Sequence, residues 1–313
     1  EPLVLVCVHL SSFHGLSEPN RIFCLNTAQV NMICSLKWLT LVVFFSALSA
    51  GSCETILILD LNADKKVRVN SENKVISWGN SAIHQSITEF IGQDIGRKVA
   101  GSGLPKWGKK DPLIGGHRTL HFKQQELVCF DEDSFDGLTT GKGYTWFSVV
   151  SVLEQRVGVK DVNSFFGNLR NGGKYEGLWG CLEDNNLLWA GVRNGKTFGR
   201  FDMNNPKLSG PVLQKNRYYL IASRMHKGQG DMKVELFLND IKPVATVHFP
   251  VIPEANPSKL VVGQERDAVE HPGKESFDGS IARLLIYEGG LDDVKFRQKI
   301  NELMKMYKIK RGE

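Results

Sequence analysis

The sequence predicts an all-β sandwich with a single helix at its C-terminus. Short apolar or alternating segments are separated by Gly, Asn, Asp and Pro, and the 31 glycines among 313 residues follow no three-residue period. No helical pattern falls between these segments, which excludes a parallel βαβ fold. Strands are expected at 56–61, 74–78, 118–122, 126–130, 144–152, 187–193, 217–225, 232–238, 244–249, 259–263 and 280–287.

Alternation within the strands predicts which side chains face the core. In 232–238 the apolar residues alternate with Lys233 and Glu235. In 187–193 the core set is Leu188, Ala190 and Val192. Trp189 and Arg193 then lie on the opposite face of that strand. The segment 144–152 is apolar on both faces, as in a central strand between two layers.

A helix is predicted at the C-terminus, within 291–313. Its apolar stripe consists of Phe296, Ile300, Leu303, Met304 and Tyr307. Asp292 or Asp293 can cap its first turn. The lysines and arginine at 305–311 suit the negative end of the helix dipole, so we interpret them as a solvated helix end rather than a membrane or nucleic-acid patch.

Residues 277–309 resemble the C-terminal signature of the laminin-G-like, concanavalin A-like jelly rolls of secreted bacterial proteins. The matching residues are Phe277, Asp278, Gly279, Ile286, Tyr287, Lys305 and Tyr307. Residues 75–80, followed by Gln85, resemble the opening of the same domains. The resemblance implies a two-sheet antiparallel jelly-roll sandwich of the lectin/glucanase type over 53–290, with the helix of 291–313 packed on it.

An apolar stretch of 13 residues, 38–50, follows Met32 and Lys37 and ends in small residues. It is too short to span a membrane and has the order of a secretory signal peptide, which we assign to 32–52. Residues 1–31 then precede the start of the signal, and we interpret them as an upstream translation artefact. The protein is expected to be secreted or in the cell envelope.

Cysteine usage supports an exported protein. Cleavage after Ser52 would leave Cys53 at the N-terminus within a relaxed bacterial lipobox, which makes Cys53 a lipidation candidate. Cys129 and Cys181 would then be available to form a disulfide in an oxidising compartment. The formal net charge of +5 is mild for this length, so no nucleic-acid partner is expected. A membrane is expected to be a partner only through a lipid anchor.

Enzymatic chemistry has little sequence support. A retaining glycosidase needs two carboxylates about 5 Å apart, and no strand carries such a pair. We therefore assign no catalytic residue, although a lyase site assembled from a distant His and Tyr stays open. Asp131 and Asp133 either form a solvated turn or offer carboxylates to Ca²⁺, the one cofactor considered.

Binding has a better signal. Trp189 and Arg193 share the face of 187–193 that points away from the core, and Trp179 lies near them in sequence. Aromatic faces and directional donors are typical of carbohydrate recognition. The alternative is that Trp189 fills a second layer of core. The expected function is extracellular, non-enzymic binding or adhesion, with a glycan or a cell-surface protein as partner. The alternatives are a glycoside hydrolase, a lyase and a structural envelope protein.

Overall fold

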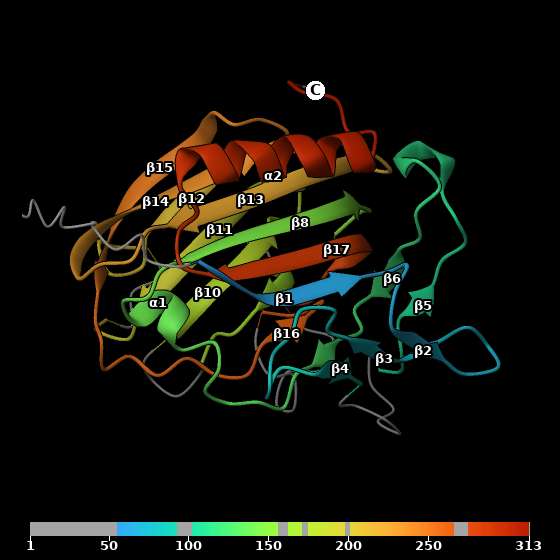
Figure 1. Ribbon diagram of the computed structural model, residues 1–313, viewed down its shortest axis with the longest axis horizontal. Coiled ribbons are helices and arrows are strands. Elements are labelled where there is room, and N and C mark those ends of the chain that lie inside the picture. The colour runs from blue at the N-terminus through green and yellow to red at the C-terminus, as the bar shows by residue number, and fades with distance from the viewer. Residues whose placement is uncertain are drawn as a thin grey trace, which may run out of the picture. The chain divides into compact units, whose positions relative to one another are not determined.

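The computed structural model is a two-layer β-sandwich with a helix on one outer face (Figure 1). It describes residues 55–92, 102–155, 162–170, 175–197, 201–265 and 275–312. The predictions for 1–31, 32–52 and Cys53 lie outside these residues. None of the helices in the described ranges is long and apolar enough to cross a lipid bilayer.

The first sheet is antiparallel and carries the helix. Its strand order is β15–β14–β13–β8–β17–β6–β5, with β1 also paired to β17. The bounds are β1 (Ile56–Asn62), β5 (Lys106–Trp107), β6 (Leu120–Lys123), β8 (Tyr144–Val152), β13 (Tyr218–Met225), β14 (Gly230–Leu238), β15 (Pro243–Val251) and β17 (Asp278–Glu288).

The second sheet is also antiparallel, in the order β12–β11–β10–β9–β16–β7–β4–β3–β2. The bounds are β2 (Val67–Val69), β3 (Val75–Gly79), β4 (Glu89–Ile91), β7 (Leu127–Val128), β9 (Asn163–Gly167), β10 (Glu176–Leu182), β11 (Leu187–Asn194), β12 (Lys207–Val212) and β16 (Val261–Val262). Two short helices, η2 (Pro112–Ile114) and α1 (Gly137–Thr140), lie in the connections.

The main core fills the space between the two sheets, and the predicted facing of the strands is confirmed. Leu188, Ala190 and Val192 of β11 face this core, as do Val234 and Leu236 of β14. Every residue of β8 is buried, because its other face lies under the helix. Because both faces of this strand are buried, the first sheet packs against the second sheet on one side and against the helix on the other.

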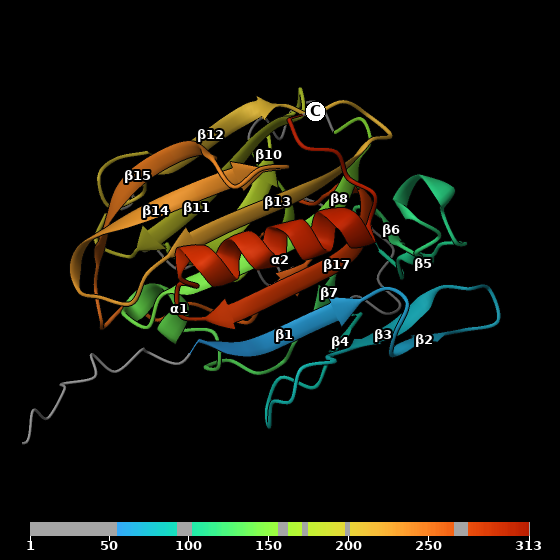
Figure 2. The same cartoon turned by 45° about the horizontal axis from the view of Figure 1, so that its top comes forward.

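The helix α2 (Asp293–Met306) packs on the outer face of the first sheet, over β13, β8 and β17 (Figure 2). Asp292 caps it by accepting a hydrogen bond from the Lys295 N–H at 2.8 Å, as predicted. The predicted stripe forms a second apolar cluster with residues of these three strands, such as Phe147 of β8 and Leu220 of β13. The helix is therefore an integral layer of the fold.

Candidate functional site

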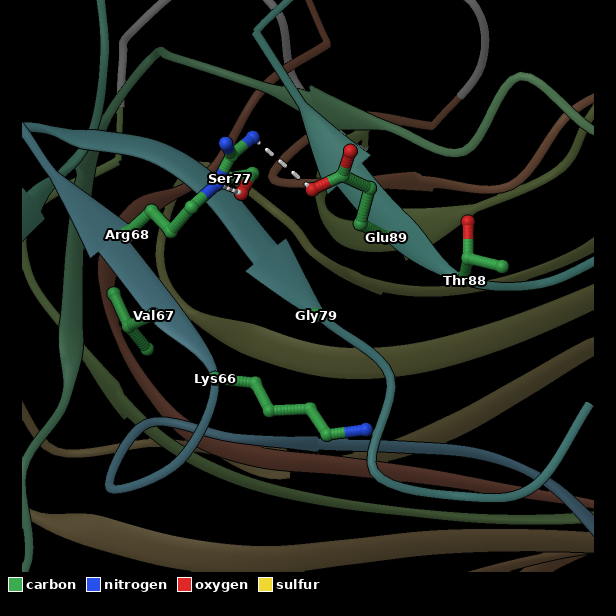
Figure 3. Close-up of a pocket in the computed structure, with 7 residues that line it drawn as sticks. All are labelled: Lys66, Val67, Arg68, Ser77, Gly79, Thr88 and Glu89. Carbon is green, nitrogen blue, oxygen red and sulfur yellow. Dashed lines mark hydrogen bonds and ion pairs between the residues drawn. The ribbon is translucent and has the colours of Figure 1, made fainter.

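A pocket of about 410 Å³ lies on the second sheet, across β2, β3 and β4 (Figure 3). We call it the β2–β4 pocket. Its lining residues are mostly charged or hydroxyl-bearing: Lys66, Val67, Arg68, Ser77, Gly79, Thr88 and Glu89. The volume lies within the range of roughly 300–1,000 Å³ that is typical of small-ligand sites.

Strand register places these side chains together. Arg68 lies directly opposite Ser77, and Gly79 lies directly opposite Glu89. Directly opposed residues share a face of the sheet, and here it is the face away from the core. Gly79 is needed at the floor of the pocket, because a Cβ atom there would lie 2.9 Å from the Cβ of Lys66.

Polar contacts order the pocket while leaving its groups accessible. The Arg68 Nε donates to Ser77 Oγ at 2.7 Å, and the Arg68 guanidinium lies 3.3 Å from a Glu89 carboxylate oxygen. The side chains of this pair are 66% and 44% exposed, so the ion pair contributes little to stability. Lys66 Nζ donates to the Asn80 carbonyl at 2.7 Å. The pocket offers two cations, a carboxylate and the Thr88 hydroxyl to a ligand, whereas Ser77 is 1% exposed and supports Arg68.

Asn80 fixes the backbone behind the pocket. It is 3% exposed, and its Oδ1 accepts hydrogen bonds from the N–H groups of Asp60 and Ala82. Its Nδ2 donates to the carbonyls of Ile58 and Ile87, each at 2.8 Å. All the hydrogen-bonding capacity of one buried amide thus joins β1 to the loop between β3 and β4. The pocket is therefore built on a rigid support.

The predicted binding residues Trp179, Trp189 and Arg193 are brought together on the outer face of β10 and β11, but they are buried. Their exposed fractions are 2%, 1% and 6%. The two indoles meet edge to face, with ring centroids 5.5 Å apart. The Arg193 guanidinium lies 5.2 Å from the Trp179 ring centroid. Trp189 therefore belongs to a second layer of packing and does not present an exposed stacking face.

Small neighbours explain this burial. Trp179 lies between Gly167 and Gly191 in the register, and a Cβ on Gly191 would lie 2.4 Å from the indole. The indole can therefore lie close against the sheet. Phe201 packs on Trp189 at 5.7 Å between ring centroids and is itself 43% exposed. That this aromatic cluster contacts a ligand stays a prediction.

In the acidic turn at Asp131 and Asp133, the side chains of Asp131 and Glu132 make contacts within the protein. Asp131 accepts a hydrogen bond from the Ser134 N–H at 2.7 Å, and Glu132 pairs with Arg170 at 2.7 Å and with Lys259 at 3.3 Å. Within the described ranges no three His, Cys, Asp or Glu side chains lie close enough to hold a metal ion. These contacts agree with the solvated-turn interpretation, and the calcium alternative stays a prediction.

Asp136, in the same turn, gives a pH prediction. Burial, followed by the charge of Asp133, raises the pKa of Asp136 to about 6, and its buried Oδ1 accepts no hydrogen bond from the described residues. Between about pH 4 and pH 6 the folded state therefore holds a proton on Asp136 that the unfolded chain has lost. The free energy of unfolding accordingly falls as pH rises through this window. Asp136→Asn should raise the melting temperature at pH 7.5, and this gain should shrink as pH falls to 4.

Melting curves at several pH values test the prediction. Asp184→Asn, on an exposed turn, is the matched control and should follow the unaltered chain at each pH. A gain for Asp136→Asn that is equal at pH 4 and pH 7.5 would contradict the assignment.

The predicted disulfide between Cys129 and Cys181 is wrong. Both residues are buried thiols. Cys129 follows β7 and faces the main core, whereas Cys181 of β10 faces the outer aromatic cluster, with Ser164 Oγ 3.0 Å from its sulfur. Strands β16 and β9 lie between them, a separation of about 14 Å at the usual strand spacing. A disulfide needs Cα atoms within about 7 Å.

A histidine–tyrosine pair of the kind that lyases use does occur. The rings of His117 and Tyr307 lie 4.7 Å apart, and His117 Nδ1 lies 2.5 Å from an Asp64 carboxylate oxygen. Tyr307 is fully buried, and burial raises its pKa to about 12. Its hydroxyl is not exposed to solvent, and a lyase site stays an untested alternative.

No protein-family model matches the chain, and no curated protein matches it. Solved structures give weak similarities. Domain 4 of the Geobacillus stearothermophilus arabinanase AbnA, in complex with arabinotriose, is 16% identical, with a TM-score of 0.46 over 80% of this chain and 98% of that domain. The sialidase carbohydrate-binding module CBM40 of Ruminococcus gnavus, bound to α2,3-sialyllactose, is 18% identical, with a TM-score of 0.39 over 52% and 85%. Both are all-β sandwiches.

The chain also covers about a third of a larger enzyme. Trypanosoma rangeli sialidase in complex with sialic acid is 12% identical, with a TM-score of 0.47 over 82% of this chain and 34% of the enzyme. At these identities and scores the similarities concern folding pattern alone, and function has to be argued from the residues of this chain.

Proposed function

We propose that the chain is an extracellular, non-catalytic carbohydrate-binding module of the laminin-G-like type, and that it holds a glycan in the β2–β4 pocket. The observation that carries this proposal is the polar lining of the pocket on three hydrogen-bonded strands. Export, either by secretion or with a lipid anchor at Cys53, is part of the same proposal.

The chemistry of the pocket suits sugar hydroxyl groups. Each hydroxyl both donates and accepts a hydrogen bond, and the pocket offers partners of both kinds. Arg68 supplies a planar set of donors, Glu89 supplies acceptors, and the Thr88 hydroxyl can donate or accept. A largely apolar ligand would leave these groups without water or partners, which is costly. The pocket therefore favours a hydrated ligand such as a short stretch of glycan.

The presence of one carboxylate among the described lining residues of the pocket supports binding without catalysis. Glycoside hydrolysis normally uses two carboxyl groups, one on each side of the scissile bond. Glu89 is the one carboxylate among the described lining residues, and its oxygen already lies beside Arg68. Glu89 is therefore assigned to orienting the bound ligand.

A glycan array, run with and without Ca²⁺, identifies the ligand, and two variants then test the site. Arg68→Ala and Glu89→Gln should each weaken binding about tenfold or more, because a hydrogen bond to a charged group contributes roughly 1.5–3 kcal/mol. Both side chains are largely exposed, so melting temperatures should be unchanged. Lys142→Ala, at the α1 end of the sandwich, is the control and should bind normally.

Unchanged affinity in both pocket variants would contradict the proposed site. Release of new reducing ends from a polysaccharide by the unaltered chain would instead favour the alternative, a polysaccharide-acting enzyme.

A further inference from the structure

Two basic stretches that are far apart in the sequence meet at one end of the sandwich. The loop from β5 to β6 carries Lys109 and Lys110, and the C-terminal end of α2 carries Lys308 and Lys310. Arg217, the residue before β13, lies with Lys308 and Lys310. We call these five residues the cationic face. Figures 1 and 2 both show the short helix η2 of this loop beside the end of α2.

Contacts between the two stretches fix their arrangement. A Cβ on Gly115, at the end of η2, would lie 3.0 Å from the Met306 carbonyl oxygen and 3.6 Å from Lys308 Cγ. On the other side of the loop, the Tyr218 hydroxyl donates to an Asp111 carboxylate oxygen at 2.8 Å. Both basic stretches are therefore held by ordered parts of the fold.

A cavity of about 190 Å³ opens within the cationic face. Arg217, Lys308 and Lys310 line it together with the polar residues Asn216, Tyr218 and Asn239. The lining combines positive charge with amide groups that can donate hydrogen bonds. An anionic group carried on a polar backbone matches this lining.

Three of the five cationic side chains of this face have no carboxylate partner among the described residues. In the described part of the chain, Lys109, Lys110 and Lys308 belong to no ion pair. The nearby carboxylates have other partners: Asp64 contacts His117, and Asp240 contacts Arg311. At the opposite end of the first sheet Lys142 pairs with Glu288 at 2.9 Å. Uncompensated like charges on one surface raise its positive potential and attract polyanions.

Lys308 adds a second, independent observation. Helix α2 ends in a Schellman motif: the Ile309 N–H donates to the Met304 carbonyl at 2.9 Å, and Lys308 adopts a left-handed conformation with φ of 52°. Glycine is strongly preferred at this position, because a side chain there is strained. The chain nevertheless has lysine, which points its charge out beside the cavity at a cost in stability.

We propose that the cationic face binds an anionic polysaccharide, sulfated or rich in uronic acid, at a site separate from the β2–β4 pocket. Single-stranded nucleic acid is less well matched, because such sites stack bases on exposed aromatic rings, and the one lining aromatic, Tyr218, is half-buried with its hydroxyl bound to Asp111. A lipid surface would need a larger apolar area than the exposed Leu113 provides.

Binding to dextran sulfate and to polygalacturonate, with neutral dextran as the uncharged reference, tests the proposal. The double variant Lys308→Gln/Lys310→Gln should bind both polyanions at least tenfold more weakly. The control Lys142→Gln/Lys227→Gln removes the same charge at the α1 end and should bind normally. Binding by the unaltered chain should also weaken as salt is added.

Lys308→Gly separates ligand binding from a structural role. It should raise the melting temperature, because the strain is relieved, and it should weaken polyanion binding. Equal weakening in the two double variants would overturn the proposal in favour of a general charge effect. Tighter binding to phosphatidylglycerol vesicles or to an oligodeoxynucleotide than to dextran sulfate would overturn the choice of ligand. Arg68→Ala should leave polyanion binding intact. Loss of glycan binding at the β2–β4 pocket can therefore be distinguished from loss of polyanion binding at the cationic face.

Discussion

Arg224→Ala is expected to destabilise the fold by about 3 kcal/mol, the lower end of the cost of breaking a buried ion pair, because Glu235 keeps Lys233 as a second partner. The Arg224 and Glu235 side chains are 6% and 8% exposed and lie 2.8 Å apart between the first sheet and α2. The guanidinium also donates to the Leu291 carbonyl at 3.0 Å and to Asp293 at 2.7 Å. Removing it leaves Glu235 with Lys233, whose Nζ lies 2.8 Å from the other carboxylate oxygen, and it removes two hydrogen bonds at the start of the helix. Chemical denaturation measures the loss.

Two controls separate the causes. Asp293 is 81% exposed, so Asp293→Asn should cost less than about 1 kcal/mol. Arg224→Met combined with Glu235→Leu should recover most of the stability, because an apolar pair replaces the buried ions without leaving a charge. A loss of under 1 kcal/mol for Arg224→Ala would show that the ion pair does not fasten α2 to the sheet.

Trp189→Ala is expected to destabilise the fold by about 3–5 kcal/mol, because it empties a closely packed site. The indole is 1% exposed, touches Trp179 and Phe201, and has Lys207 Nζ 5.0 Å from its ring centroid. Glycan affinity per folded molecule should be unchanged, because the ring is covered. Melting temperature and affinity have to be measured on the same samples.

Phe201→Ala is the matched control on the same cluster. Its ring is 43% exposed, so the loss of stability should be clearly smaller than for Trp189→Ala. A Trp189→Ala variant with unaltered stability and weakened glycan binding would restore the original prediction that Trp189 is a binding residue.

The fold was predictable where the hydrophobic pattern is strong. The segment 144–152 matches β8, and the alternation in 232–238 identified the core face of β14 correctly. The helix was also predictable, because its apolar stripe, its cap at Asp292 and the basic residue in its last turn all indicate a helix over the same residues. Consistency between local signals and packing is what makes such elements readable from one sequence.

Strands β9, β10 and β12 were missed for a physical reason. Glycine weakens a strand signal, yet in β10 Gly177 and Gly180 lie where side chains of neighbouring strands need room. Gly191 likewise leaves room for the Trp179 indole, and Gly167 leaves room for the Glu265 carbonyl group. These glycines serve packing across strands, which a single sequence does not display.

The candidate sites were harder to predict than the fold. Alternation correctly placed Trp189 and Arg193 away from the main core, but it could not show that Phe201 and Lys207 cover them. The β2–β4 pocket depends on the register of two three-residue strands, and its Arg68 and Glu89 meet from 21 positions apart. The cationic face depends on contacts between the β5–β6 loop and the end of α2, which are far apart in the sequence. Tertiary structure alone creates these surfaces.

The position of a bound glycan tests the central claim most directly. The measurement is a titration of the isotope-labelled chain with the strongest neutral ligand from the array, followed through backbone amide chemical shifts. The shifted amides are expected to cluster on β2, β3 and β4 around Arg68, Ser77 and Glu89. Shifts centred on Tyr175 and Phe201, above the buried tryptophans, would contradict the account.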